Sequence, residues 1–414
     1  MRLKELEREA WLCNHCSLCT QTVNDDSGFY RICPVYEQLR FEDSSARGHN
    51  TIAFYLLNGT LEYNQEIADC VYNCTTCAAC EEICKPFGTM LAQMGGSNLK
   101  TLVDPVMSVF GASLEPVRSV ELLEAMRADC VDLGLQPESV GQMAANVEKN
   151  SNIYGEPHAD RLKWAEGLDM PGTADTVLFV GCNPAYRRQE IAVSTAKILR
   201  GCGIEFAVLP DEWCCGSPLL RTGSVDTAQK MIRHNVDMLK EMKVRNLVTP
   251  CAEGYMAISR DWPKYVGELP FKVQHVSELL ARLMSERKLK LKRRINKKVT
   301  YHDPCHLGRV MGVYGEPRAV LRAIPGIELV EMYPARHATW CCGAGGGLRD
   351  SNPELAQAIG AAKVPLIRET GASVLASACP FCKTQFVEVI EKSGEPIEVR
   401  DLTELVAESM GVRI

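Results

Sequence analysis

The spacing of the cysteines limits what this chain can fold into more than any other feature of its sequence. The 414 residues include 20 cysteines. The first residues, Met1 to Glu7, mix acids and bases without the apolar stretch of a secretory signal. We therefore expect a cytoplasmic protein, in which reducing systems keep thiols out of disulfide bonds. Metal ligation is then the expected use of the thiols.

Two cysteine runs in the first hundred residues have the spacing of iron–sulfur ligands. The first is Cys13, Cys16 and Cys19, followed after a long gap by Cys33 and Pro34, and the second is Cys74, Cys77, Cys80 and Cys84. In bacterial two-cluster ferredoxins three cysteines of a run hold one cubane, and the fourth, beside a proline, reaches the other. This rule gives the first 4Fe–4S cubane Cys13, Cys16, Cys19 and Cys84, and the second Cys74, Cys77, Cys80 and Cys33. Zinc is disfavoured, because zinc sites usually pair two C-x2-C elements.

The segments around these runs predict helices. Residues 53–57 and 66–72 have the helical spacing of apolar side chains, which indicates an α-helical ferredoxin type. We expect the insertion from Thr20 to Ile32 to form an exposed loop. Residues 104–171 are expected to form a helical connector, in which the isolated Cys130 serves as a buried apolar side chain.

An internal repeat fills the rest of the chain. Cys182, the pair Cys214 and Cys215, and Cys251 recur as Cys305, the pair Cys341 and Cys342, and Cys379, at offsets of 123, 127 and 128 residues. Strand candidates at 176–181, 247–250, 299–302 and 374–378 precede the first and third cysteine of each copy. Alternating strands and helices predict a small parallel sheet in each copy, with its ligand site beyond the carboxyl ends of the strands. A glycine after each pair allows close backbone approach, and the following helix would direct its positive N-terminus at an anionic cluster.

The two copies differ in their number of candidate ligands. The second has Cys305, Cys341, Cys342, Cys379 and Cys382, whereas the first has Cys182, Cys214, Cys215 and Cys251, with Gly254 in place of the last cysteine. Four thiolates can hold zinc or a cluster, or the site can be a structural relic, and the sequence does not separate these alternatives. The glycine-rich segment 343–347 is not expected to bind a flavin or nicotinamide dinucleotide, because cysteines precede it and no acidic partner follows at the usual distance.

These motifs resemble the cysteine-rich CCG-domain family, and the whole chain resembles the family formed by the D subunit of CoB–CoM heterodisulfide reductase and its bacterial relatives. The resemblance rests on the twin ferredoxin runs, on residues 213–223 and on residues 302–309. In that family a complete five-cysteine motif holds a noncubane 4Fe–4S cluster at which a disulfide is cleaved. The resemblance places such a cluster on Cys305, Cys341, Cys342, Cys379 and Cys382, and it leaves the first copy without a complete ligand set.

Disulfide cleavage also consumes protons. His302 and His306 flank Cys305 and are candidates to supply them. The alternative is that both histidines form hydrogen bonds that orient the loop.

Partners and location follow from charge and hydropathy. No segment offers the roughly twenty apolar residues of a membrane span, and a net charge of −6 gives no footprint for nucleic acid. The basic run at 282–298 is expected to be a solvated linker, with docking to a partner or an anionic membrane as the alternative. Electrons must be exchanged with another redox subunit, either a flavoprotein or a membrane cytochrome or quinone-linked subunit. We therefore expect the protein in the cytoplasm, or at the cytoplasmic face of the membrane through that partner.

The sequence thus predicts an α/β fold with a two-cluster α-helical ferredoxin domain at 1–103, the connector at 104–171, and two small parallel-sheet CCG domains at 172–290 and 291–414. The leading hypothesis is an oxidoreductase subunit that passes electrons through two cubanes to a noncubane cluster and reduces a small disulfide or thiol-related substrate. Relatives imply an alternative, an electron-transfer subunit for flavin dehydrogenases of hydroxy acids or glycerol 3-phosphate, or for a benzoyl-CoA reductase complex. A third possibility is a zinc-stabilised interaction module. Cys70 and Cys202 have no assigned role.

Overall fold

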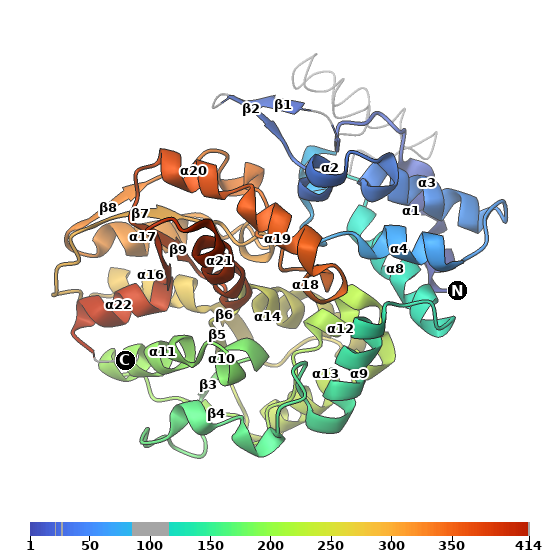
Figure 1. Ribbon diagram of the computed structural model, residues 1–414. Coiled ribbons are helices and arrows are strands. Elements are labelled where there is room, and N and C mark those ends of the chain that lie inside the picture. The colour runs from blue at the N-terminus through green and yellow to red at the C-terminus, as the bar shows by residue number, and fades with distance from the viewer. Residues whose placement is uncertain (21, 26–27, 85–115, 413–414) are drawn as a thin grey trace, which may run out of the picture.

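The structure is a computed structural model that describes residues 1–20, 22–25, 28–84 and 116–412 (Figure 1). A helical N-terminal unit is followed by two units that each contain a parallel sheet. This is the fold class that the sequence predicts. The boundary expected between residues 103 and 104 lies outside the described residues.

The N-terminal unit is built from short helices around the two cysteine runs. Its elements are the 3-10 helix Arg2–Leu6, α1 (Glu7–Leu12), β1 (Thr22–Asp25), β2 (Gly28–Arg31), α2 (Pro34–Leu39), the 3-10 helix Glu42–Ser44, α3 (Ala46–Leu57), α4 (Gln65–Tyr72), α5 (Ala79–Ile83), α8 (Ser119–Asp132), α9 (Glu138–Asn150) and the 3-10 helices His158–Asp160 and Lys163–Ala165. The helices expected at 53–57 and 66–72 are confirmed as parts of α3 and α4. Apolar faces of α3, α4 and α8 share one core, and Cys130 is fully buried within it.

The insertion between Cys19 and Cys33 is not the loop that the sequence predicts. Strands β1 and β2 pair in antiparallel register, with Thr22 opposite Arg31 and Asp25 opposite Gly28. The β-forming residues Val23, Phe29 and Tyr30 favour this pairing. Asn24, Asp25 and Gly28, which suggested a loop, therefore belong to paired strands.

The two repeat units have the same topology. The first contains β3 (Thr176–Leu178), α10 (Cys182–Tyr186), α11 (Gln189–Gly201), β4 (Ala207–Val208), α12 (Ser217–Thr222), α13 (Val225–Glu241), β5 (Asn246–Thr249), α14 (Ala252–Met256), the π-helix Ala257–Asp261, α15 (Trp262–Val266), β6 (Lys272–His275) and α16 (Val276–Ser285). The second contains β7 (Lys297–Tyr301), the π-helix His306–Val310, α17 (Gly315–Ala323), β8 (Ile327–Val330), the 3-10 helix Arg336–Ala338, α18 (Leu348–Ser351), α19 (Pro353–Ala361), α20 (Val364–Glu369), β9 (Val374–Ser377), α21 (Pro380–Ser393), β10 (Glu398–Asp401) and α22 (Leu402–Met410).

The strand order explains where the cysteines lie. The sheets run β4-β3-β5-β6 and β8-β7-β9-β10, and all pairs are parallel. The first and third strands of each repeat are therefore neighbours at the centre of the sheet. The second strand lies outside the first and the fourth lies outside the third, so the chain leaves this central pair in opposite directions. Such a point of reversal opens a crevice at the carboxyl ends of the strands. Cys182 and Cys251 follow these two strands in the first repeat, and Cys305 and Cys379 follow them in the second.

The repeats pack on each other about a pseudo-two-fold axis. Helix α11 of the first repeat packs on α22 of the second, and α16 of the first packs on α17 of the second (Figure 1). Helices α11 and α17 both follow the first strand of their repeat, and α16 and α22 both follow the fourth. Because each contact is the counterpart of the other, equivalent residues of the two repeats can meet near the axis.

A buried arginine ties the three units together. Arg127 of α8 is fully buried and donates hydrogen bonds to the carbonyl oxygens of Val71 and Cys74, both at 2.8 Å. It also donates to the carbonyls of Arg221 in the first repeat, at 2.7 Å, and Gly346 in the second, at 2.8 Å. One guanidinium thus holds the second cysteine run against both repeats.

The surface offers no span for a bilayer within the ranges that the structure describes, since none of their helices is both long and apolar enough. Most of the basic side chains between α16 and β7 are exposed, while Leu289 and Ile295 anchor this segment in the core.

Candidate functional site

The two cysteine runs of the N-terminal unit adopt the same unusual backbone. His15 and Ser17 in the first run have φ of 54° and 65°, and Thr76 and Ala78 at the equivalent positions of the second have φ of 50° and 58°. Non-glycine residues seldom adopt this left-handed conformation, which costs of order 1–3 kcal/mol each and clusters at functional sites. The two runs therefore share the same strained loop conformation.

The thiols of the first run converge on one cavity. Cys13, Cys16 and Cys19 line it together with Cys84 from the end of the second run. These are the four residues that the ferredoxin spacing rule assigns to the first cubane. Cys16 is exposed, whereas the other three are partly buried.

A second cavity is lined by Cys33, Cys74, Cys77 and Cys80. These are the four residues that the same spacing rule assigns to the second cubane. Cys80 lines the first cavity as well, so the two cavities share a wall. Burial raises the pKa of the Cys74 thiol to about 11. Such a thiol stays protonated until a metal displaces its proton.

The second cysteine run lies directly against the second repeat. Side chains of Cys77 and Cys341 are hydrogen-bonded, and this contact, ahead of burial, raises the pKa of Cys77 well above its usual value. The glycine-rich segment 343–347 makes this approach possible. A Cβ on Gly346 would lie 2.6 Å from the carbonyl oxygen of Cys74, and one on Gly345 would lie 2.8 Å from that of Thr75. The glycines therefore serve backbone packing between the second repeat and the second cysteine run.

The five cysteines of the second repeat form one buried cluster. Cys305, Cys341, Cys342, Cys379 and Cys382 are all buried. Hydrogen bonds link Cys305 to Cys341, Cys341 to Cys342, Cys342 to Cys382 and Cys382 to Cys379. Hydrogen bonds from Cys341 and Cys382 lower the pKa of Cys342 well below its usual value. Those from Cys251 and Cys382 do the same for Cys379.

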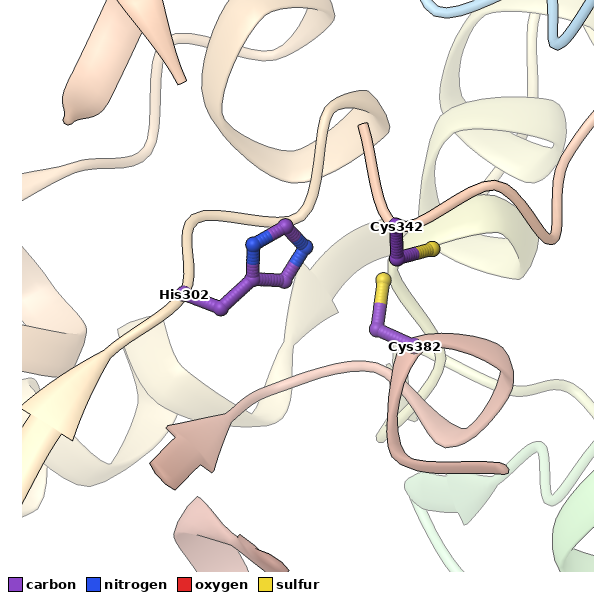
Figure 2. Close-up of side chains that lie close together, drawn as sticks. All are labelled: His302, Cys342 and Cys382. Carbon is purple, nitrogen blue, oxygen red and sulfur yellow. The ribbon is translucent and has the colours of Figure 1, made fainter. Parts of the chain in front are cut away.

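The two candidate histidines lie differently with respect to these thiols. One ring nitrogen of His302 lies within 4.8 Å of the Sγ atoms of Cys342 and Cys382, and Figure 2 shows the ring edge directed at both. His306 instead donates from Nε2 to the carbonyl oxygen of Thr76, at 3.2 Å. Burial lowers the pKa of His306 to about 4 and that of His302 well below its usual value. Both rings are therefore neutral at neutral pH.

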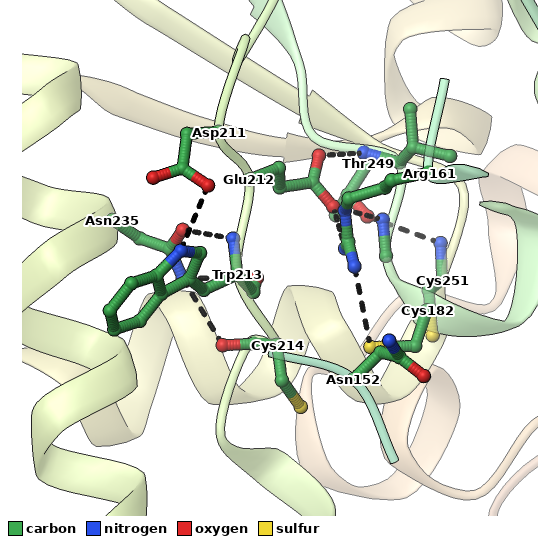
Figure 3. Close-up of polar contacts among 12 residues, drawn as sticks. Asn152, Arg161, Cys182, Asp211, Glu212, Trp213, Cys214, Asn235, Thr249 and Cys251 are labelled. Carbon is green, nitrogen blue, oxygen red and sulfur yellow. Dashed lines mark hydrogen bonds and ion pairs between the residues drawn. The ribbon is translucent and has the colours of Figure 1, made fainter. Parts of the chain in front are cut away.

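The four cysteines of the first repeat line a common cavity. Arg161 donates to Cys182 Sγ at 3.9 Å and forms a buried ion pair with Glu212, which also accepts from the backbone N–H groups of Val180 and Gly181, each at 2.8 Å (Figure 3). A hydrogen bond from Cys214, and then the charge of Arg161, lower the pKa of Cys182 to about 6.

Asn235 holds the cysteine pair of the first repeat in place. Its side-chain nitrogen donates to the carbonyl oxygens of Trp213 and Cys214, both at 3.1 Å, and its oxygen accepts from Trp213 N–H at 2.9 Å (Figure 3). A Cβ on Gly254 would lie 3.8 Å from Cys251 Sγ and would meet nothing closer than 3.5 Å. The position that carries a cysteine in the second repeat is therefore open in the first.

The two repeat sites touch at the pseudo-two-fold axis. Cys251 and Cys379 are counterparts in the repeat, and their thiols are hydrogen-bonded to each other. Phe381 of the second repeat lines the cavity of the first. Glu253 lines this cavity too, and burial raises the pKa of its carboxyl to about 7. The sites form one continuous region.

The remaining cysteines lie apart from these sets. Cys130 is in the N-terminal core, Cys202 packs at the edge of the core that the two repeats share, and Cys70 donates to Asp43 at 3.5 Å. Sequence reasoning missed the charged groups around the thiols, namely Arg161, Glu212, Glu253, Arg309 and Lys363. A signal existed for Lys363, since it is the single charged residue in the mostly apolar stretch 355–367.

The donor sets fit iron–sulfur clusters. Soft thiolates in groups of four and five, held in cavities and strained loops, suit an iron–sulfide core better than a hard cation. Two buried polar atoms near the second-repeat thiols, His302 Nε2 and Arg309 Nη2, have no protein hydrogen-bond partner. Arg309 also donates to the carbonyl oxygen of Cys77 at 3.0 Å. Unpaired donors of this kind fit a site meant for an anionic group with exposed sulfur.

Comparisons with known proteins agree with this geometry. The model of the cysteine-rich domain matches residues 176–259 and 299–387, and that of the 4Fe-4S dicluster domain matches residues 9–86. The D subunit of dihydromethanophenazine:CoB–CoM heterodisulfide reductase from Methanosarcina barkeri is 38% identical over 357 residues, which cover 84% of this chain and 80% of that protein.

Two further relatives are longer than this chain. The B subunit of fumarate reductase (CoM/CoB) from Methanothermobacter marburgensis is 30% identical, with 81% of this chain and 61% of that protein covered. EtfAB:quinone oxidoreductase from Syntrophomonas wolfei is 26% identical, with 91% and 51% covered. By its twin ferredoxin runs, its two cysteine-rich domains and its similarity along most of both chains, this protein belongs to the iron–sulfur family that includes the D subunit of CoB–CoM heterodisulfide reductase.

Proposed function

We propose that this chain is the iron–sulfur subunit of a heterodisulfide-reductase-like enzyme, in which electrons pass through two cubanes to a noncubane cluster that serves disulfide reduction. The first cubane is held by Cys13, Cys16, Cys19 and Cys84, the second by Cys33, Cys74, Cys77 and Cys80, and the noncubane cluster by Cys305, Cys341, Cys342, Cys379 and Cys382.

The observation that carries this proposal is the unbroken series of cysteine sites. Cys80 lines both ferredoxin cavities. Cys77 of the second cavity contacts Cys341 of the second repeat. No gap in the series requires a separate carrier between one ligand set and the next.

Electrons enter, on this proposal, at the first cubane. Cys16 is exposed, whereas the thiols of the second repeat are buried. A redox partner, such as a flavoprotein or a membrane cytochrome or quinone-linked subunit, would therefore dock near Cys16.

The reaction converts one disulfide into two thiols with two electrons and two protons. A cluster bound at the second repeat would supply the electrons and an iron site for a substrate sulfur. The protein orients that site and shields it from water by burial. Since both His302 and His306 are neutral at neutral pH, we propose that they act as hydrogen-bonding groups that orient the loop. Neither would be an imidazolium that is ready to donate a proton.

Electron paramagnetic resonance of anaerobically oxidised protein tests the proposal. We expect a signal that appears only when a thiol or heterodisulfide is added, because substrate sulfur must reach the cluster. The same samples after reduction should show two cubane signals. A preparation without iron and acid-labile sulfide would contradict the proposal altogether.

One substitution distinguishes the role of the second-repeat site from that of the two cubanes. Cys382→Ser should abolish disulfide reduction while both cubanes remain reducible. Cys202→Ser, which alters a cysteine outside all the ligand sets, should change neither property. Unchanged turnover in Cys382→Ser would show that the second repeat is not the catalytic site.

Gly254 favours a second candidate function. Without a fifth cysteine in the first repeat, the chain can act as an electron conduit for a flavin dehydrogenase and have no substrate of its own. A relative named as an EtfAB:quinone oxidoreductase is compatible with such a role. Normal cubane signals together with no response to thiols would favour the conduit.

A further inference from the structure

A buried lysine lies behind the cysteines of the second repeat. Lys363, between α19 and α20, has no exposed surface. Its ammonium donates to His302 Nδ1 at 2.8 Å, to the Trp340 carbonyl oxygen at 3.0 Å and to Thr339 Oγ1 at 3.1 Å. An ammonium has three N–H groups and no acceptor, so these three acceptors use all of them.

The charge of Lys363 has no directly paired carboxylate, although the charge of nearby Asp303 favours the ammonium. None of the carboxylates in the described part of the chain forms an ion pair with it. Both carboxylate oxygens of the nearby Asp303 accept hydrogen bonds from Arg318, at 2.6 and 2.8 Å. A buried charge without a counter-ion is costly. An anionic group in the second-repeat site would offset that cost.

The buried cation of the first repeat, Arg161, differs from Lys363 in having a carboxylate partner. There Arg161 lies beside Cys182, but the buried carboxylate of Glu212 pairs with it (Figure 3). The cation of the first site is thus held in a direct ion pair, and that of the second is not. The difference matches the unequal number of thiols in the two repeats.

The lysine also fixes the tautomer of His302. Because Nδ1 accepts a hydrogen from Lys363, the ring proton of the neutral imidazole must lie on Nε2. Nε2 is buried and has no hydrogen-bond partner among the described residues. In Figure 2 this outer nitrogen faces the thiols of Cys342 and Cys382, consistent with the separation of at most 4.8 Å.

We propose that Lys363 is a positioning residue that holds His302 as an Nε2–H donor toward the sulfur atoms of the second-repeat cluster, so that His302 hydrogen-bonds to the cluster and is not an iron ligand. This inference rests on the proposed function, because it requires a cluster on the second-repeat cysteines. Hydrogen bonds to cluster sulfur and a nearby positive charge both favour the more reduced state and raise the reduction potential. The pair thus tunes this cluster in favour of accepting electrons from the second cubane.

Pulsed paramagnetic resonance of the wild-type protein tests the role of His302 without any substitution. On the signal of the noncubane cluster we expect a weak nitrogen coupling and an exchangeable proton, as for a hydrogen-bonded ring. A strong coupling typical of coordinated imidazole would overturn the inference. Absence of a cluster signal, with iron for two cubanes only, would overturn both the inference and the proposed function.

Two variants test the role of Lys363. Lys363→Met should lower the reduction potential of the noncubane cluster and weaken the exchangeable-proton coupling, with iron content unchanged. Lys363→Arg should restore part of the potential by keeping the charge. The cubane potentials in the same samples are the internal control. An unaltered noncubane potential in Lys363→Met, in a sample that retains its iron, would refute the inference and leave the proposed function standing.

Discussion

The guanidinium of Arg127 donates a hydrogen bond of 2.8 Å to the carbonyl oxygen of Gly346, a residue 219 positions later in the chain. The same side chain donates to Cys74 O at 2.8 Å. One cation therefore fixes the second ferredoxin run against the glycine-rich loop of the second repeat.

Replacement of Arg127 by methionine should destabilise the protein strongly. Several buried carbonyls would lose their donor, and each such loss costs about 1–3 kcal/mol. We expect a loss of at least about 3 kcal/mol in the free energy of unfolding, together with faster proteolysis between the N-terminal unit and the repeats. Arg322→Met, at a side chain that is 58% exposed, is the control and should have little effect. Equal stability of both variants would contradict the role of Arg127.

Replacement of Gly254 by cysteine should complete the ligand set of the first repeat. The open space beside Cys251 accommodates a Cβ without a clash. We expect iron and acid-labile sulfide to rise relative to wild type. Gly254→Ser, which fills the same space without a thiolate, should leave both unchanged. A cysteine variant with wild-type metal content would show that position 254 does not decide occupancy.

The first cubane should be the first to decay in air. Cys16 is exposed, whereas Cys77 is buried beneath the second repeat. Oxygen reaches an exposed cluster sooner. Timed exposure followed by anaerobic reduction and paramagnetic resonance should show loss of one cubane signal before the other, with the early loss also produced by Cys16→Ser. Simultaneous decay would speak against this difference in access.

Stability should fall as the pH rises toward neutrality because of Asp401. Burial raises the pKa of this carboxyl to about 7, against about 3.9 in an unfolded chain. Between these values the folded state binds more protons, so its stabilisation is complete below about pH 4 and lost as the pH passes about 7.

Asp401→Asn should remove that part of the pH dependence. The amide oxygen can still accept from Thr403 N–H, which the carboxylate accepts at 2.8 Å. We expect a gain of up to about 4 kcal/mol at pH 8 and little change at pH 4. Thermal unfolding from pH 4 to 8 checks this, with the exposed Asp175→Asn as control. A parallel shift at every pH would point to a cause other than titration.

The cysteine spacing was sufficient to predict much of this architecture. Ligand spacing is a local property, so residue order alone could predict which thiols gather at each ferredoxin cavity, including Cys84 at the first and Cys33 at the second. The repeat offsets likewise predicted the parallel sheets. The fourth strands, β6 and β10, were missed, although each leads into a helix with a capping box, at His275 and Asp401. Their short alternating segments carry no cysteine.

Other features depend on packing between distant segments. The contact of Cys251 with Cys379 requires the pseudo-two-fold arrangement of the repeats, which no local pattern specifies. Lys363 lies 61 residues from His302, and only the fold brings them together. The paired strands β1 and β2 were mistaken for a loop because Asn24, Asp25 and Gly28 are residue types that disfavour strands, and each strand has only four residues.

The left-handed residues of the ferredoxin runs have a consequence for how the protein matures. His15, Ser17, Thr76 and Ala78 together hold on the order of 4–12 kcal/mol of conformational strain, and an empty loop would relax. Beside Thr76 the loop is covered by Gly345 and Gly346, whose backbones pack directly against Cys74 and Thr75. We therefore expect iron and sulfide to enter the second run most readily before the C-terminal half packs over it, which would make the order of cofactor loading part of the folding pathway.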